Sequence, residues 1–206
     1  MAAPGLAPHK KGAKRTGATI VFADETGFLQ RPSVHRTWGP RGRTPVTEEH
    51  FNWKRLSATG ALAWRPVEAD TRLFLSVKPG AVDSAQVVSF LRSLRRHLRG
   101  QVVLIWDGRP AHRSRVVAEH LRSQRRWLRG ERLPADAPEL NPLGYLWATL
   151  KNKDTANYSP DTLEDLDGQL RRAARRLRRR DALGLSLVKH AGLLSDKQYL
   201  LLCETQ

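Results

Sequence analysis

The chain has 206 residues, enough for one domain with a sizeable core, and its 40% hydrophobic content favours a folded protein. Its 36 Lys and Arg residues against 20 Asp and Glu give a net charge of +16, which favours a polyanionic partner, nucleic acid first. A basic soluble protein without such a partner is the alternative. The single cysteine, Cys203, excludes an internal disulfide and a zinc cluster built from cysteines.

The two termini and the lack of long apolar runs predict how the chain divides into domains. Residues 1–17 are basic and lack the apolar core of a signal peptide, so we expect a disordered basic arm there. Residues 18–185 are expected to form one domain and residues 186–206 a C-terminal tail. No run approaches the roughly 20 apolar residues that span a membrane. We therefore expect a cytoplasmic, nucleoid-associated protein without a membrane partner.

The first half of the chain predicts several antiparallel strands. An apolar, β-branched run over residues 18–28 contains Asp24 and Glu25 near its end and indicates a buried strand. Residues 34–46 have the Gly and Pro pattern of a hairpin with its turn at 39–42. Residues 54–64 and 71–80 each indicate a further strand.

The second half alternates helix and strand. Asp83 is the expected cap of a helix that ends at Gly100, and the apolar run 102–106 predicts a strand buried on both faces. A helix over 113–124, a short strand over 126–134, a helix from Pro142 to about Asn152, and a long helix from Ser159 follow. The last helix carries Arg171, Arg172, Arg175, Arg176, Arg178, Arg179 and Arg180. This order predicts an α/β fold, a mixed sheet with flanking helices.

Two acids occupy similar places in this pattern. Asp24 and Asp107 lie 83 residues apart, and each follows an apolar strand. A single Asp at a strand end is more often a turn or cap residue than a ligand. If the two strands are neighbours, however, the two carboxylates meet at one edge of the sheet and can hold a divalent metal ion.

A third acid would complete a two-metal site for phosphoryl transfer. Its natural place is the first turn of the helix after the third strand, which faces the same edge. We expect Asn141 as N-cap, Pro142 at N1, Leu143 at N2 and Gly144 at N3. Glu is favoured at N3, whereas Gly costs about 1 kcal/mol relative to Ala within a helix.

Three segments carry a resemblance to a known family. The stretches FADETGFLQRPSVHRTWGPRGRTPV, VVLIWDGRPAHRS and LPADAPELNPLGYLWATLK, in this order, resemble the DDE catalytic domain of bacterial insertion-sequence transposases in the mariner-related superfamily. The likeness covers about residues 19–151. It implies a ribonuclease-H-like fold in which an Asp, Asp, Glu triad holds two Mg²⁺ ions, cleaves DNA at transposon ends and joins the 3' ends to target DNA.

The triad transfers to this chain with one exception. Asp24 and Asp107 match the first and second acids, as catalytic residues and metal ligands, and the third position is Gly144. There are 36 residues between Asp107 and Gly144, the spacing typical of the bacterial branch. We therefore expect impaired metal binding and charge stabilisation. Glu139 or Asp136, in the preceding loop, could substitute, although neither matches the family's metal ligand.

Basic and aromatic residues around these motifs are candidate DNA contacts. His112 matches a family His that would reach a phosphate or a water, with packing at a helix start as the alternative. Arginines surround Trp38 in the expected hairpin, where they would bind phosphate, or would simply be solvated. The Arg-rich helix presents the same two alternatives. The expected DNA contacts are Arg36, Arg41, Arg43, His112, Arg113 and Lys151.

The resemblance also implies helix-turn-helix domains ahead of the catalytic domain. Met1 lies only 23 residues before Asp24. We therefore expect either the second product of a split reading frame, with a separate helix-turn-helix subunit or upstream frame, or a truncated remnant. A homodimer is a further partner that the resemblance leaves open.

Three hypotheses follow from the sequence. The first is a metal-dependent transposase domain, impaired at Gly144, that acts on transposon ends and target DNA. The second is a non-catalytic, basic DNA-binding remnant of a transposase. The third is a ribonuclease-H-type nuclease that acts on RNA, which would share the fold but not the three motifs.

Overall fold

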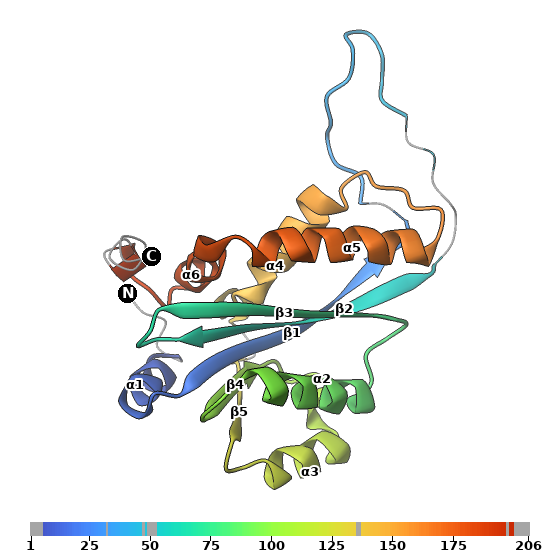
Figure 1. Cartoon of the computed structure of the whole chain (residues 1–206). Coiled ribbons are helices and arrows are strands. Elements are labelled where there is room, and N and C mark those ends of the chain that lie inside the picture. The colour runs from blue at the N-terminus through green and yellow to red at the C-terminus, as the bar shows by residue number, and fades with distance from the viewer. Residues whose placement is uncertain are drawn as a thin grey trace.

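The computed structural model describes residues 6–31, 33–46, 48, 53–134, 137–196, 198 and 199. Within these residues one five-stranded mixed sheet has the order β3-β2-β1-β4-β5 (Figure 1). The strands are β1 (Thr19–Leu29), β2 (Arg55–Arg65), β3 (Asp70–Pro79), β4 (Val102–Trp106) and β5 (Leu128–Arg132). β2 is antiparallel to β1 and to β3, whereas β1, β4 and β5 run parallel. The predicted mixed sheet with flanking helices is confirmed.

The two faces of the sheet carry separate cores, because side chains alternate along each strand. On β1, Ile20 and Phe22 belong to one core, and Val21 and Ala23 belong to the other. Each face is covered by its own helices. β1 and β4 therefore lie inside the molecule, as their nearly continuous apolar sequences predict.

Helices cover both faces (Figure 1). Leu143, Leu166 and Leu185 place three helices in the first core, and Leu91 and Val117 place two in the second. The first set consists of α4 (Leu143–Thr149), α5 (Leu163–Arg178) and α6 (Asp181–His190), and the second of α2 (Ser84–His97) and α3 (Arg115–Ser123). No helix in the described part of the chain is long and apolar enough to cross a membrane.

Local capping fixes where the helices begin. The side chain of Asp83 accepts a hydrogen bond from Gln86 N, as expected for the cap of α2. α5 begins at Leu163 rather than near Ser159, because Thr162 forms a capping box with Asp165. α4 also begins one residue later than predicted, at Leu143. Pro142 is therefore the N-cap instead of Asn141, and Gly144 lies at N2 instead of N3. Asn141 Oδ1 nevertheless accepts the Leu143 N–H at 3.1 Å.

Residues 7–16 of the predicted disordered arm form a helix instead. α1 (Ala7–Thr16) ends at Gly17, whose φ of 67° lies in the left-handed region that favours glycine. Leu6 and Ala13, only 3% and 2% exposed, pack in the first core. The basic composition of this segment concealed that buried pair. Residues 1–5 lie outside the described residues.

The predicted hairpin is also wrong. Residues 34–46 form an extended loop that stands away from the sheet (Figure 1), with one turn in which Arg43 N donates to Pro40 O at 3.0 Å. Proline cannot donate to a strand ladder, which disfavours pairing here. The base of the loop is held instead by Asn157, which exchanges side-chain hydrogen bonds with the backbone of His35 at 2.8 and 3.0 Å.

Candidate active site

The topology brings the two predicted carboxylates to neighbouring strands. β1 and β4 are paired and parallel, with Phe22 opposite Ile105. Asp24 and Asp107 each lie two residues beyond that pair. Adjacent strands are about 4.8 Å apart. By the alternation of side chains, both acids are in phase with Phe22 and Ile105, on the face that α4 covers.

Asp24 is held by the helix that was expected to supply the third acid. Trp147 on α4 donates its indole N–H to Asp24 Oδ2 at 2.8 Å. The indole ring lies against Gly60 of β2, the residue paired with Asp24. A Cβ at position 60 would lie 2.7 Å from Trp147 Cη2, so only glycine admits the ring at this point. Burial raises the pKa of Asp24, against the opposing effect of the Trp147 hydrogen bond.

Asp107 is held by a cation on each side. Its Oδ1 lies 2.8 Å from His112 Nδ1, and its Oδ2 accepts a hydrogen bond from Arg109 Nε at 2.9 Å. Burial by itself would raise the pKa of Asp107. The hydrogen bonds from His112 and from the Arg109 backbone outweigh it, so the pKa is lowered.

His112 joins Asp107 to a third acid, Glu25. His112 Nε2 lies 3.0 Å from Glu25 Oε1, and the imidazole stacks on Trp106 with ring centroids 4.3 Å apart. Burial would lower the pKa of His112. Its hydrogen bonds to Asp107 and Glu25 outweigh burial and raise the pKa to about 10. Glu25, Asp107 and protonated His112 therefore form one largely buried ion network.

Position 144 lies one helical turn before Trp147, on the same side of α4. Gly144 is exposed, and no atom would lie within 4 Å of an added Cβ. Its φ lies outside the left-handed range, so an L side chain is compatible with the backbone. The fold therefore has room for a carboxylate side chain at position 144, one turn from the residue that bonds Asp24, although the sequence supplies none.

The donors present fit one hard cation rather than two. Two carboxylates suffice for a Mg²⁺ ion that keeps several waters. A two-metal pair needs a further shared carboxylate, which the glycine at position 144 does not supply. Glu25 is engaged by His112 and lies out of phase with Asp24 along β1. Among the described residues no group of three His, Cys, Asp or Glu could hold a metal ion.

The remaining predicted residues are dispersed. The side chain of His112 is 2% exposed and both of its ring nitrogens are engaged, which favours the packing alternative over a direct contact with DNA. Arg113 is exposed beside it. Lys151 Nζ lies 5.7 Å from the Phe28 ring centroid, at the start of the π-helical segment η3 (Leu150–Asp154). The exposed loop residues are Arg36, Arg41, Arg43 and Trp38.

The acids proposed to replace the third ligand remain untested. Glu139 is exposed in the short 3-10 turn η2 (Pro138–Leu140). Asp136 lies outside the described residues. The substitute role of both stays a prediction.

Sequence reasoning missed several residues that hold the carboxylates. Glu25 directly follows Asp24, and Arg109 lies two residues after Asp107, so their proximity was visible in the sequence. Trp147 was predicted only as a core residue, and Gly60 was not singled out, because their contact joins two segments 87 residues apart.

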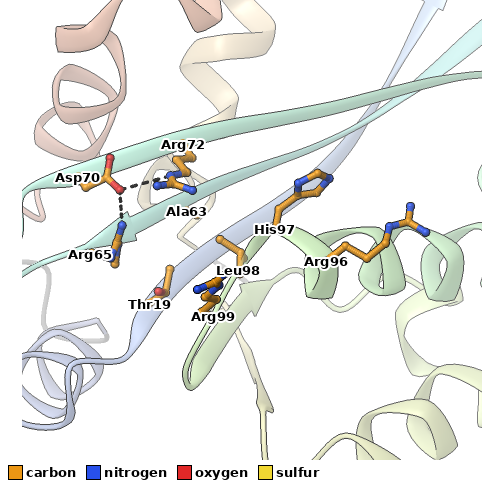
Figure 2. A pocket seen from close by; sticks show the side chains of 9 residues that line it. All are labelled: Thr19, Ala63, Arg65, Asp70, Arg72, Arg96, His97, Leu98 and Arg99. Carbon is orange, nitrogen blue, oxygen red and sulfur yellow. Dashed lines mark hydrogen bonds and ion pairs between the residues drawn. The ribbon is translucent and has the colours of Figure 1, made fainter.

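A separate hollow of about 480 Å³ lies near the start of β1 (Figure 2). Arg65 and Arg72, which share Asp70 at 2.7 and 3.4 Å, line it together with Arg96, His97 and Arg99 from the end of α2 and its following loop. Thr19, also in the lining, is five residues from Asp24, about 17 Å along an extended strand. The hollow is therefore not part of the carboxylate site.

The strand order and the two acids at neighbouring strands define a ribonuclease-H-like domain. Within that class, residues 19–167 match the model of the DDE superfamily endonucleases. This match covers more than half of the chain. The chain belongs to the DDE superfamily endonuclease family.

Solved structures support the fold. The Mos1 transposase paired-end complex with the left transposon end is 18% identical, with a TM-score of 0.64 over 96% of this chain and 59% of that one. The Mos1 mariner paired end complex with Mn is 21% identical, with a TM-score of 0.61 over 89% and 57%. The catalytic domain of the Mos1 mariner transposase is 18% identical, with a TM-score of 0.57 over 97% and 87%.

The chain thus spans about three-fifths of the Mos1 chains in the two paired-end complexes. Comparison with curated proteins gave no match.

Proposed function

We propose that this chain is the catalytic domain of a DNA transposase whose strand cleavage and 3'-end joining are impaired by Gly144. One observation carries the proposal. Asp24 lies on β1 and Asp107 directly follows the paired strand β4, and the first turn of α4, which covers this face, has open space at position 144. Family membership supplies the reaction class, which is divalent-metal-dependent attack on a DNA phosphodiester.

Asp24 and Asp107 are the residues that would hold Mg²⁺, which would supply Lewis-acid stabilisation of the reacting phosphate. Trp147 orients Asp24 through its N–H, and Arg109 and His112 orient Asp107. A metal ion would have to compete with Arg109 for Asp107 Oδ2. A carboxylate at position 144 would add a ligand next to Asp24, and its absence weakens the site.

The proposed substrate is duplex DNA at transposon ends and target sites. Two of the similar Mos1 structures are paired-end complexes, one of them with the left transposon end. For this chain, we propose the exposed side chains Arg36, Arg41, Arg43 and Arg113 and the half-buried Lys151 as phosphate contacts. A homodimer, a separate helix-turn-helix subunit and action on cytoplasmic DNA belong to the same proposal.

A non-catalytic DNA-binding remnant is the second candidate. It is favoured by the two cationic partners of Asp107, because such a network also stabilises a carboxylate with no metal present. This candidate predicts salt-dependent duplex binding that survives the double change Asp24→Ala and Asp107→Ala.

The Gly144→Glu variant tests the catalytic proposal. We expect it to nick supercoiled plasmid in Mg²⁺ or Mn²⁺ when a DNA-binding module is supplied, at a rate at least about a hundredfold above the parent, because it restores a carboxylate for charge stabilisation. Agarose-gel conversion of supercoiled to open-circular DNA measures it.

Gly144→Gln is the matched control, since it fills the same space without charge. Adding Asp24→Asn to the Gly144→Glu variant should abolish its nicking activity. An inert Gly144→Glu variant that keeps the parental circular dichroism and thermal stability would show that position 144 is not the missing ligand.

A further inference from the structure

Every exposed residue in the C-terminal half of α5, from Arg171 onward, and in the two residues after it is an arginine. Leu166, Leu170 and Leu177 bury the opposite face in the first core. We define the α5 arginine surface as the exposed residues Arg171, Arg172, Arg175, Arg176, Arg178, Arg179 and Arg180 together with Lys78 of β3.

This surface is hollowed rather than flat. Five of its arginines line a shallow, open depression of about 320 Å³: Arg172, Arg175, Arg176, Arg179 and Arg180. A second hollow of about 370 Å³ lies between α5 and the edge strand β3, where Lys78 faces Arg171, Arg175 and Arg178. Arg175 lines both hollows, so the positive surface is continuous from the helix to the edge of the sheet.

Only part of this charge is balanced within the chain. Arg171 pairs with Asp167, and Arg176 with the buried carboxylate of Asp154. Arg178 donates to the backbone oxygen of Leu75 at 3.2 Å. Arg175, Arg179 and Arg180 have no carboxylate within salt-bridge distance among the described residues. The surface therefore retains at least three unbalanced guanidinium groups.

Repulsion between these neighbouring arginines destabilises the folded chain. Arg171 and Arg175, Arg172 and Arg176, and Arg175 and Arg179 are like charges at i,i+4, each pair costing about 0.2 to 0.5 kcal/mol. The helix dipole favours cations in the last turn, which accounts for one or two of them. A row this long instead fits an extended polyanion, since arginine forks match phosphate oxygens.

The surface lies on the same side of the sheet as the carboxylate site and close to it. Strand register places Asp24, Gly60 and Leu75 in one row across β1, β2 and β3. Two strand spacings, about 10 Å, separate Asp24 from Leu75, whose oxygen accepts the Arg178 hydrogen bond. α4 and α5 both pack on this face (Figure 1). We infer that a double helix presenting one phosphate to Asp24 would continue toward α5.

We propose that the α5 arginine surface binds the sugar-phosphate backbone of duplex DNA flanking the carboxylate site, through Arg175, Arg179 and Arg180. This inference rests on the proposed function only in choosing DNA as the polyanion. The contact is independent of metal and of Asp24 and Asp107, because it is made by guanidinium groups alone.

The test uses the full chain, EDTA, and a 30-base-pair duplex of arbitrary sequence, with binding followed by fluorescence anisotropy across a salt series. The triple change Arg175→Ala, Arg179→Ala and Arg180→Ala should weaken binding at least about tenfold at 0.1 M salt. It should also lower the slope of log affinity against log salt by about 2 to 3, since each lost phosphate contact removes about 0.9.

A triple change at Arg122, Arg125 and Arg126 is the matched control. It removes the same charge from exposed residues in and after α3, on the other side of the sheet. An equal loss in both triple variants would reduce the effect to net charge and overturn the proposal, as would unchanged binding by the α5 variant. Tighter, equally α5-dependent binding to single-stranded RNA of the same length would assign the surface to RNA and also overturn it.

Failure of the proposed function gives a different pattern. Suppose that the Gly144→Glu variant is inert and that the α5 variant selectively loses DNA binding. These results would support the present inference and contradict the catalytic proposal. Retention of binding by Asp24→Asn with Asp107→Asn is expected in either case.

Discussion

His112 lies between two acids, with only 2% of its side chain exposed. Protonation gives each ring nitrogen a hydrogen to donate, one toward Glu25 and one toward Asp107, at 3.0 and 2.8 Å. The network ties β1 to the turn η1 (Ala111–Arg113) that follows Asp107. Its chemical effect is to hold Asp107 ionised and in a fixed orientation for whatever cation approaches it.

This network predicts a pH-dependent stability. The folded pKa of His112, about 10, is above its ordinary 6.5, so the stabilisation is fully present below pH 6.5 and is lost as pH rises through 10. Urea unfolding of the parent and of His112→Gln in EDTA should show a stability difference that shrinks by a few kcal/mol between pH 6 and pH 10.5, since one pKa unit is about 1.4 kcal/mol.

The difference between parent and variant isolates His112 and the two acids it contacts, because groups that do not touch His112 titrate alike in both. A difference that stays constant, or that grows with pH, would mean that His112 is neutral in the folded chain. His112 was singled out from the sequence as a DNA contact. Its actual partner Glu25 was not, because two positions 87 residues apart meet only when β1 and η1 are placed side by side.

At the scale of elements, the contact between β2 and α4 positions the site. Gly60 pairs with Asp24 across the strands and leaves room for the indole of Trp147, which then bonds Asp24. The glycine, the tryptophan and the acid thus act as one packing unit. The sequence predicted all three elements, but this close approach depends on the register of β1 against β2 and on how α4 lies across them.

Gly60→Ala should therefore destabilise the chain by about 1 to 3 kcal/mol through overpacking. The added Cβ would be 2.7 Å from Trp147 Cη2, so the ring must move and its bond to Asp24 must weaken. Thermal unfolding measures the loss, and near-ultraviolet circular dichroism reports the tryptophan environment.

Gly27→Ala on β1 is the matched control. Its Cβ would meet no atom within 4 Å, so we expect unchanged or slightly raised stability. Equal effects of the two substitutions would show that the loss comes from replacing a strand glycine and not from displacing Trp147.

At the scale of the whole molecule, metal affinity should couple to folding. A ligand that binds only the folded chain stabilises it by RT ln(1 + [L]/Kd), about 2.7 kcal/mol at a hundred times Kd. With two carboxylates, we expect 10 mM Mg²⁺ to raise the melting temperature of the parent slightly. The rise should be larger by several degrees in Gly144→Glu, which adds a third.

Differential scanning fluorimetry with Mg²⁺, Mn²⁺ and EDTA measures these shifts. Asp24→Asn should abolish the shift in both backgrounds, whereas Na⁺ at the same ionic strength controls for screening of the +16 net charge. Equal shifts in the parent and in Gly144→Glu would contradict a ligand position at residue 144.

The sequence by itself predicted the mixed sheet with flanking helices, the two acids Asp24 and Asp107 on neighbouring chain segments of it, and the glycine at the third position, although Asp24 lies inside β1 rather than at its end. Apolar alternation, caps and motif spacing are local properties that a linear pattern records. The helix in residues 7–16 and the absence of a hairpin in residues 34–46 were not predicted. The helix forms because Leu6 and Ala13 pack in the core, and proline disfavours strand pairing in residues 34–46.

Only the tertiary structure decided what each acid touches. It placed Asp24 against Trp147, tied Asp107 to Arg109 and His112, and buried Glu25 in the same network. It also placed the arginines of α5 beside the edge strand β3. Arg178 bonds Leu75 there, and Leu75 lies in one row with Asp24 across the sheet. These contacts join residues far apart in the chain, and their strength depends on burial and angle, which three-dimensional packing alone fixes.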